Sequence, residues 1–280
     1  MAEVPGLQEA WGTLVENVPA WQLRSFGTFV LHEMFYWGSY LPFFVMDRTP
    51  YFHKWKIQDE KENDLPGQWQ CFKAVMLNHM LVVFPIVMVS HLFEFLGVDA
   101  GYEVPSLITI AFQVFVCFLI EDFCFYWGHR ALHTDFLYRH IHSVHHTYSA
   151  PFGIAAEYAH PLEVIFLGLS TIFGPIICRP HLLTLWVYLF FRCLQTVECH
   201  SGYDFPWSLN RWLPFYGGAD FHDHHHKSYS GNYASVFIWT DYIYGTDTSY
   251  RQWKSKMAAD EKKLASADCA PTDSAAKRST

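Results

Sequence analysis

The sequence predicts an all-α integral membrane protein. We expect a bundle of about four to five membrane-embedded helices, with a cytosolic helical cap that holds a histidine-rich dimetal site. Three observations carry this prediction. Hydrophobic residues make up 51% of the chain and charged residues only 16%, against roughly 25% charged in soluble domains. Long apolar runs alternate with polar loops. Of the 17 histidines, eight fall in three ordered clusters.

Charge and cysteine content argue against several classes of protein. The net charge of −8 disfavours nucleic acid as a partner. The seven cysteines are odd in number and scattered, unlike the framework of a secreted disulfide-rich domain. The N-terminus has no basic segment leading directly into an apolar core, so no cleavable signal peptide is expected. Insertion into a membrane would then use the internal apolar runs.

The first apolar run, 21–46, follows a short irregular or amphipathic lead. It is long enough to cross a bilayer, but Arg24, His32 and Glu33 interrupt it. It therefore predicts either a span or a helix lying partly in the membrane interface. A polar loop at 47–70 follows.

Two clearer runs, 72–98 and 105–127, predict a transmembrane helical hairpin with a short turn between them. The second helix is expected to run out of the bilayer carrying His129 and His133. Two further runs, 162–177 and 182–197, are each short for a span and predict a tight or partial hairpin.

The rest of the chain is divided by composition. A short aromatic helix is expected at 234–244, and after Trp253 the chain turns to Lys, Ala, Ser and Asp, which is typical of disorder. We therefore expect one membrane-embedded domain over 1–253, with its histidine region at about 115–250, and a disordered tail over 254–280.

The three clusters keep helical spacing. Histidines three or four apart share one face of a helix, and neutral imidazole is a common ligand of iron, zinc and copper. Three such faces can surround a metal centre. The clustered histidines are His129, His133, His142, His145, His146, His222, His225 and His226.

Eight imidazoles exceed the needs of one metal ion, since tetrahedral zinc takes four ligands. Two ions would recruit more histidines, and His160 and His200 are the candidates. His140 and His224 fall at spacings that point away from the metal face. The isolated histidines are interpreted as hydrogen-bonded core residues: His32, His79, His91 and His181.

Four acidic residues are candidates for orienting the ligands, because a ligating histidine usually gives its other N–H to a carboxylate or carbonyl. Asp122 is the strongest, since it shares a helix face with His129. Ordinary capping or surface roles are the alternative for each. The four are Asp122, Glu157, Glu198 and Asp220.

Lysine and arginine predict the orientation. Basic residues near spans favour the cytoplasm, and the turn 99–106 on the opposite side has none. The histidine clusters are therefore expected to face the cytosol, together with Arg48, Lys54, Lys56, Arg130, Arg139, Lys254 and Lys256.

The order HxxxH, HxxHH and HxxHH resembles the membrane fatty acid hydroxylase superfamily. Over roughly 20–250, the chain is similar to the C-4 methylsterol monooxygenases, particularly the plant-type sterol methyl oxidases. The segments that carry this resemblance are EDFCFYWGHRALH, HSVHHTYSAPFGIAAEYAHPLE, HSGYDFPWSLN, GGADFHDHHH and GNYASVFIWTDYIYGTD.

The resemblance implies two iron ions, held by the eight clustered histidines with His160 and His200 matching further family histidines. It implies a 4,4-dimethyl or 4α-methyl sterol substrate, oxidised by O2 to alcohol, aldehyde and carboxylate. Electrons would come from NAD(P)H through cytochrome b5 and its reductase, and a 4α-carboxysterol decarboxylase/dehydrogenase would act next. The protein would reside in the endoplasmic reticulum membrane, with lipid around its spans. Zinc is expected to be able to replace iron in overexpressed samples.

Other functions stay open from the residues alone. Another member of the superfamily would act on a fatty acid or sphingolipid, or desaturate a sterol, and the three histidine clusters do not exclude these activities. A metal transporter would place its ligands near the bilayer midplane, whereas these histidines follow the spans. An inactive scaffold would have lost some of the metal ligands, whereas none of the histidines is missing from the three clusters.

Overall fold

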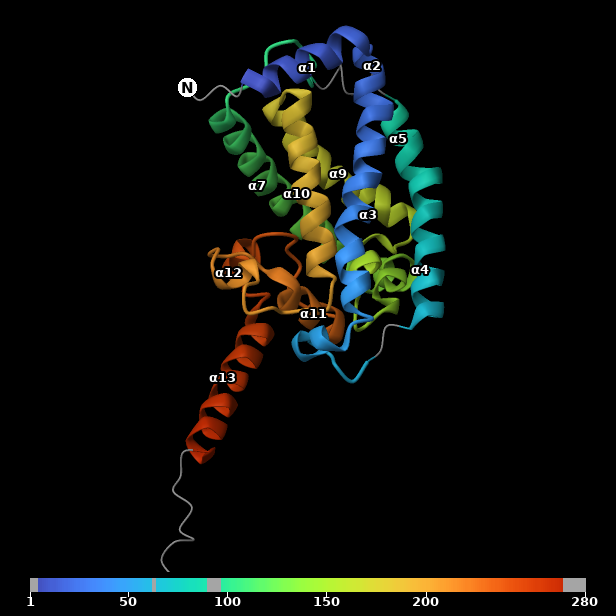
Figure 1. Ribbon diagram of the computed structural model, residues 1–280. Helices are drawn as coiled ribbons and strands as arrows, with labels where there is room; N and C mark the ends of the chain where they lie inside the picture. Colours follow the sequence, from blue (N-terminus) through green and yellow to red (C-terminus); the bar gives the residue numbers. More distant parts are fainter. Residues whose placement is uncertain (1–4, 62–63, 90–96, 269–280) are drawn as a thin grey trace, which may run out of the picture.

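The computed structural model describes residues 5–61, 64–89 and 97–268, and within these ranges the regular structure is helical, with isolated bridges but no strands. Long helices stand side by side in the upper part of the view, and short helices gather beneath them (Figure 1). The longer elements are α1 (Pro5–Asn17), α3 (Thr28–Met46), α4 (Leu65–Asn78), α7 (Leu107–Leu132), α9 (Pro161–Cys178), α10 (Leu182–Cys199), α11 (Gly218–Ser228) and α13 (Thr248–Asp268).

Shorter helical segments connect these helices. Two are π-helical turns, η1 and η3, which interrupt otherwise continuous helices. The remaining segments, with those two, are α2 (Ala20–Gln22), η1 (Leu23–Gly27), η2 (Pro50–Trp55), η3 (His79–Val83), α5 (Phe84–Met88), α8 (Asp135–His140), η4 (His142–Thr147), η5 (Gly153–Glu157), η6 (Leu209–Arg211) and α12 (Trp239–Tyr244).

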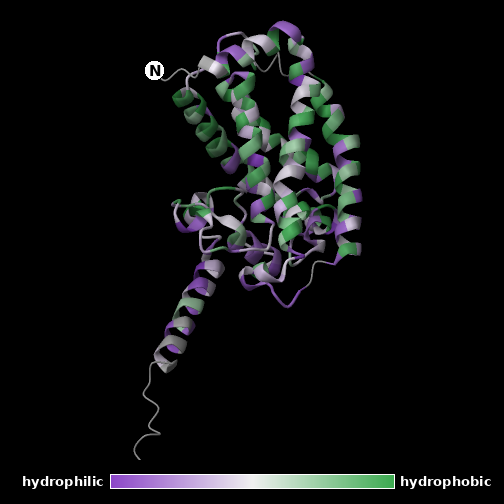
Figure 2. Cartoon of the chain, viewed as in Figure 1, coloured by the Kyte–Doolittle hydropathy of each residue, from purple (hydrophilic) through white to green (hydrophobic). Residues whose placement is uncertain are grey.

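The structure confirms the predicted class, an all-helical membrane bundle with clustered histidines. Hydrophobic residues cover the upper helices, whereas hydrophilic ones are concentrated at the lower end and along α13 (Figure 2). Four helical stretches among the described residues are long and apolar enough to cross a membrane: Leu65–Met88, Leu107–Leu132, Pro161–Cys178 and Leu182–Cys199. The apolar run 21–46, predicted either to span the bilayer or to lie partly in its interface, contains α3. This helix is not one of the four and packs along α10.

Local chemistry fixes where the spans begin. The Ser106 hydroxyl accepts a hydrogen bond from the Thr109 backbone N–H at the start of α7, and the Asp64 carboxylate accepts from Gly67 at the start of α4. The polar loop expected over 47–70 is accordingly shorter, because α4 begins at Leu65.

The two spans α7 and α9 pack in close approach. A Cβ on Gly174 would lie 2.7 Å from the Cα of Cys117, so only glycine fits at this crossing. At the end of the bundle far from the histidines, α1 lies across the helix ends (Figure 1). It is held there by the Trp11 indole, which donates to the Gly101 carbonyl at 2.8 Å.

The C-terminal segment differs from expectation. Disorder was expected from residue 254, but the structure continues the helix α13 through Asp268. The first turns of α13 are tied to α11, because the Tyr250 hydroxyl and the Lys254 ammonium both donate to Asp220. Residues 269–280 lie outside the described residues.

Candidate metal centre

Nine of the ten candidate ligands come together at one end of the bundle. The C-terminal end of α7 supplies His129 and, at its C-cap, His133, and the 3-10 helix η4 supplies three more. The C-cap of α10 supplies His200, and one face of α11 supplies the rest. The nine histidines form two groups, and within each group one nitrogen atom per ring lies within 4.8 Å of those of the other rings. One group is His129, His133, His142, His146 and His225, and the other is His145, His200, His222 and His226.

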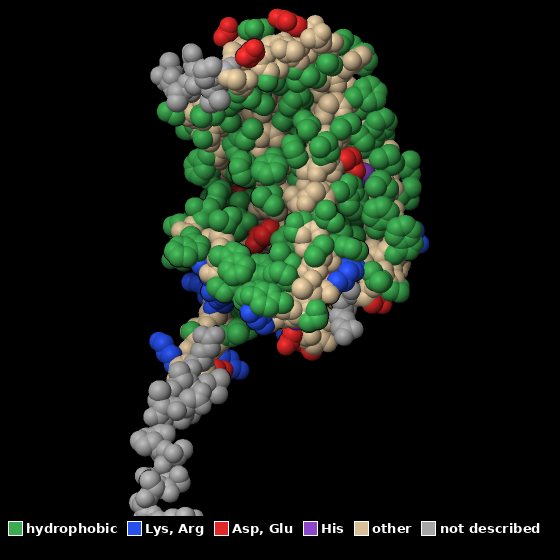
Figure 3. Space-filling model, viewed as in Figure 1, with side chains coloured by type: hydrophobic (Ala, Val, Ile, Leu, Met, Phe, Trp, Pro, Cys, Tyr) green, Lys and Arg blue, Asp and Glu red, His purple; other side chains and the backbone are tan. Residues whose placement is uncertain are grey.

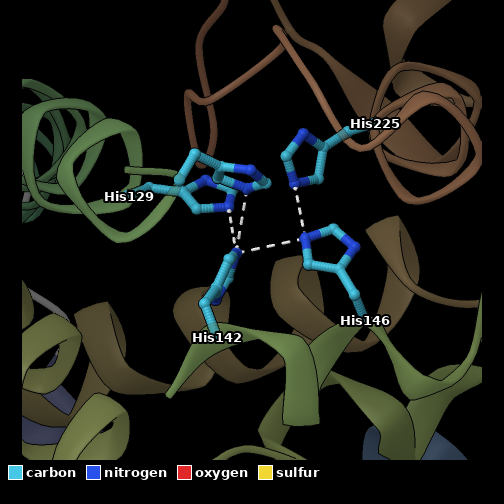
Figure 4. A group of neighbouring side chains, drawn as sticks. His129, His142, His146 and His225 are labelled. Atoms are coloured by element: carbon cyan, nitrogen blue, oxygen red, sulfur yellow. Dashed lines mark hydrogen bonds between the residues drawn. The ribbon is translucent and has the colours of Figure 1, made fainter. Parts of the chain in front are cut away.

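The rings in each group meet through their Nε2 atoms. In the five-histidine group, Nε2 of His142 lies 3.1 Å from Nε2 of His129, 3.0 Å from that of His133 and 3.1 Å from that of His146. Nε2 of His146 lies 3.1 Å from Nε2 of His225. Figure 4 shows four of these rings, from α7, η4 and α11, pointing toward one another.

The four-histidine group repeats this pattern. Nε2 of His200 lies 3.3 Å from Nε2 of His145 and 2.8 Å from Nε2 of His222, which in turn lies 3.1 Å from Nε2 of His226. The two groups adjoin, since the ring centroids of His146 and His226 are 4.7 Å apart.

The opposite ring nitrogen, Nδ1, faces an oxygen acceptor in most of these histidines. An imidazole that donates from Nδ1 presents a lone pair at Nε2. The acceptors are one carboxylate and five backbone carbonyls: Glu163 for His142, Tyr233 for His129, Tyr158 for His145, Thr196 for His200, Gly231 for His225 and Tyr148 for His226.

Converging lone pairs repel one another unless a cation lies between them. Neutral imidazole nitrogens suit iron, zinc and copper. A set of five and a set of four such donors is enough for two ions. The donor chemistry of the two groups therefore fits a dimetal site.

Burial keeps these histidines neutral. Burial lowers the pKa of His145 to about 4. Burial, together with repulsion from the charged forms of His129 and His145, lowers the pKa of His133 to about 2. The pKa values of His222 and His225 are also well below the ordinary value, first because of burial. All four rings are therefore unprotonated near neutral pH and free to bind metal.

His160 is not in either group. It caps the N-terminus of α9, where its Nδ1 accepts from the Leu162 backbone N–H at 3.2 Å. His140 and His224 point away from the groups, as their spacing predicted: His140 lies against the Phe136 carbonyl, and His224 contacts Ser249.

The four acids proposed to orient the ligands bind other partners. Asp122 accepts from the backbone N–H groups of Val236 and Phe237, and Glu157 faces His79. Glu198 accepts from the Tyr216 hydroxyl, and Asp220 accepts from Asn210, Tyr250 and Lys254. The prediction that these acids contact the clustered imidazoles is therefore corrected. Asp122 acts on His129 only indirectly. It accepts from Val236 in the same loop whose Tyr233 carbonyl faces Nδ1 of His129.

The carboxylate that does contact a ligand is Glu163, whose Oε1 lies 2.8 Å from Nδ1 of His142. Sequence reasoning missed it. The available signal was an isolated acid at the start of an apolar run, three residues after His160. Asp241 was missed as well: it accepts from the backbone N–H groups of Tyr233 and Ala234 and so fixes the carbonyl that orients His129.

A cavity of about 320 Å³ leads to the histidines. This is within the size range of ligand sites, roughly 300–1,000 Å³. Its walls are mainly apolar side chains of α5, α9 and α10, and its inner end is formed by five of the histidines. These are His129, His142, His145, His200 and His222. The arrangement can hold a hydrocarbon-rich molecule against the metal site with water excluded.

Several known proteins are similar to this chain in sequence. The fatty acid hydroxylase family model matches residues 114–246. A very-long-chain aldehyde decarbonylase of Oryza sativa subsp. indica is 47% identical over 91% of this chain and 96% of its own. Methylsterol monooxygenase 2-2 of Arabidopsis thaliana is 46% identical over 89% and 95%, and methylsterol monooxygenase 2-1 of the same plant is 43% identical over 89% and 97%.

No solved structure matches the chain significantly. The family match covers all nine converging histidines, and the plant relatives align over nearly their whole length. The chain therefore belongs to the fatty acid hydroxylase family.

Proposed function

We propose that this protein oxidises the C-4 methyl group of sterol precursors, using O2 and two iron ions bound by the nine converging histidines. The observation that carries the proposal is the pair of inward-facing Nε2 groups at the inner end of an apolar cavity. The two Arabidopsis relatives named as methylsterol monooxygenases support the substrate class.

Iron, when bound, would supply the O2 activation that attack on an unactivated methyl group requires and that no side chain provides. The chain's own residues do the rest. Backbone carbonyls and Glu163 hold each ring so that Nε2 faces inward. The apolar walls bind the hydrocarbon skeleton, exclude water and keep the methyl group at the histidine end.

Electron supply and the next reaction belong to the same proposal. Reduction of O2 needs two electrons from outside the chain, and we assign them to NAD(P)H through cytochrome b5 and its reductase. The 4α-carboxysterol product would pass to a decarboxylating dehydrogenase. Basic residues around the histidine end offer a surface for an acidic electron donor, and Figure 3 shows Lys and Arg gathered there.

The same charge distribution supports the orientation. At the opposite end in this view, near α1, Asp and Glu are visible but no Lys or Arg (Figure 3). Because basic residues flanking spans favour the cytoplasmic side, we assign the histidine end to the cytosol and the four candidate spans to the endoplasmic reticulum membrane.

A second candidate comes from the rice relative, which is named for very-long-chain aldehydes. Its identity to this chain is as high as that of the methylsterol monooxygenases. A linear aldehyde would also enter an apolar cavity and reach the histidines.

One assay separates the two candidates. Membranes containing the protein are incubated with NADH, O2 and, in parallel, a 4,4-dimethyl sterol, a 4α-monomethyl sterol and a very-long-chain aldehyde. Oxygen-dependent formation of 4-hydroxymethyl or 4-carboxy sterol is the expected result. Consumption of the aldehyde alone would overturn the sterol proposal.

A further inference from the structure

A second polar cluster lies outside the metal centre. It joins α3, η3 and η5 through His32, Glu33, His79 and Glu157. Nδ1 of His79 lies 2.9 Å from Oε1 of Glu33, and Nε2 of His79 lies 2.6 Å from Oε2 of Glu157. His79 is fully buried. Both of its ring nitrogens face carboxylates, and both can donate only in the imidazolium form. The cluster is thus an internal ion network rather than a set of free ligands.

The carboxylates at the two ends of this network have different surroundings. Glu33 does not line the cavity, and both of its oxygens have partners: Nδ1 of His32 lies 3.2 Å from its Oε1, and the Trp37 indole donates to its Oε2 at 2.9 Å. Glu157 and His32 instead line the cavity. Oε1 of Glu157 faces Nε2 of His32 across 3.8 Å, which is longer than a hydrogen bond. The carboxylate oxygen thus keeps the capacity to accept a hydrogen bond from a ligand.

The backbone joins this polar spot to the metal centre. Glu157 directly precedes Tyr158, whose carbonyl lies 3.2 Å from Nδ1 of His145. The few polar groups in an otherwise apolar pocket fix the orientation of the ligand. In a sterol, the carbon bearing the 3-hydroxyl is bonded to C-4, so a ligand that presents its 4-methyl group to the metal site carries its hydroxyl beside it.

We propose that Glu157 and His32 bind the 3-hydroxyl group of the sterol and thereby hold ring A at the metal site. The hydroxyl donates to Oε1 of Glu157 and lies against Nε2 of His32. The buried His79 keeps Glu157 charged and in place. This inference rests on the proposed sterol function and names the group that selects a sterol over an unbranched lipid, which has no hydroxyl at that position.

The test measures binding rather than turnover. Full-length protein in lipid nanodiscs carries a radiolabelled 4α-methyl sterol, which is displaced either by the unlabelled 3β-hydroxy sterol or by its 3-deoxy analogue. A hydrogen bond to a charged group predicts that the wild type prefers the hydroxy sterol by about tenfold or more. Glu157→Gln, which keeps the side-chain volume but removes the charge, should reduce that preference several-fold and leave binding of the deoxy analogue unchanged.

Glu33→Gln is the matched control. It makes the same chemical change at the end of the network that lies outside the cavity, so the preference should remain that of the wild type even if the protein is less stable. Equal binding of the two sterols by the wild type would overturn the proposal, and so would equal changes of preference in the two variants.

Turnover measured in the same preparation separates this inference from the proposed function. Oxygen-dependent oxidation of the 4-methyl group without a hydroxyl preference would overturn the anchor alone. A hydroxyl preference without oxidation would support the anchor and overturn the assigned reaction.

Discussion

Nδ1 of His142 lies 2.8 Å from Oε1 of Glu163, and both side chains are buried. His142 is also the ring that the other members of its group approach, with three Nε2 contacts of 3.0–3.1 Å. One carboxylate on α9 therefore orients the central ring of the five-histidine group. It also places an ionisable carboxyl group beside a site that would hold cations.

Replacing Glu163 with glutamine should weaken metal binding. The amide still accepts from His142 but no longer offsets cationic charge, and loss of such a partner costs about 10–100-fold in metal affinity. Chelator competition on the metal-loaded protein measures this change. Glu198→Gln is the control, since that carboxylate accepts from the Tyr216 hydroxyl instead. Unchanged metal retention in Glu163→Gln would contradict the assigned role.

Truncating His145 should remove one of two metal sites. His145→Ala takes one donor from the four-histidine group and leaves the five-histidine group intact. We expect bound metal to fall from about two ions per chain to about one, and methyl oxidation to be lost while the protein stays in the membrane. Elemental analysis of purified protein gives the stoichiometry.

The control for this variant lies on α11. His224→Ala removes an imidazole that contacts Ser249 and stacks on Trp253, away from both groups. It should retain both ions and full turnover. Loss of metal from His224→Ala, or full activity in His145→Ala, would refute the ligand assignment.

The metal-free protein should lose stability on acidification. An unfolded histidine takes up a proton near pH 6.5, whereas folded His145 does so near 4 and folded His133 near 2. Between these values the unfolded chain binds more protons, so the free energy of unfolding falls as pH falls, by about 1.4 kcal/mol per histidine per pH unit. Thermal unfolding in detergent at pH 7.5, 6.5, 5.5 and 4.5 should give a Tm that is highest above about 6.5. A Tm that rises on acidification would contradict this.

Adding a methyl group at Gly174 should destabilise the bundle. The new Cβ would lie 2.7 Å from the Cα of Cys117 on α7, and overpacking of this kind costs about 1–3 kcal/mol. Gly168→Ala, on the same helix, is the comparison, because a Cβ there meets nothing within 4 Å. Alanine is also the better helix former. We expect a lower Tm for Gly174→Ala and an unchanged or higher one for Gly168→Ala.

Much of the architecture could be read from the sequence because it depends on local pattern. Apolar runs gave the spans now seen as α7, α9 and α10 to within a few residues at most ends. Helical spacing paired His142 with either His145 or His146, and the structure groups it with His146. Spacing also separated His224 from its neighbours, as the structure confirms. The C-terminal helix was missed because a polar, lysine-rich composition is typical of disorder. The sequence pattern did not reveal that Asp220 would hold α13 through Tyr250 and Lys254.

The primary sequence determined which residues are available to bind metal and which segments are apolar enough to enter lipid, since both follow from side-chain chemistry and periodicity. Only the tertiary structure decided how the ligands divide, with His146 in one group and His145 in the other. It also decided that Glu163, rather than Asp122, contacts an imidazole, and that His160 caps a helix. These outcomes depend on backbone carbonyls and on helices far apart in the chain, and such contacts leave no local pattern in the sequence.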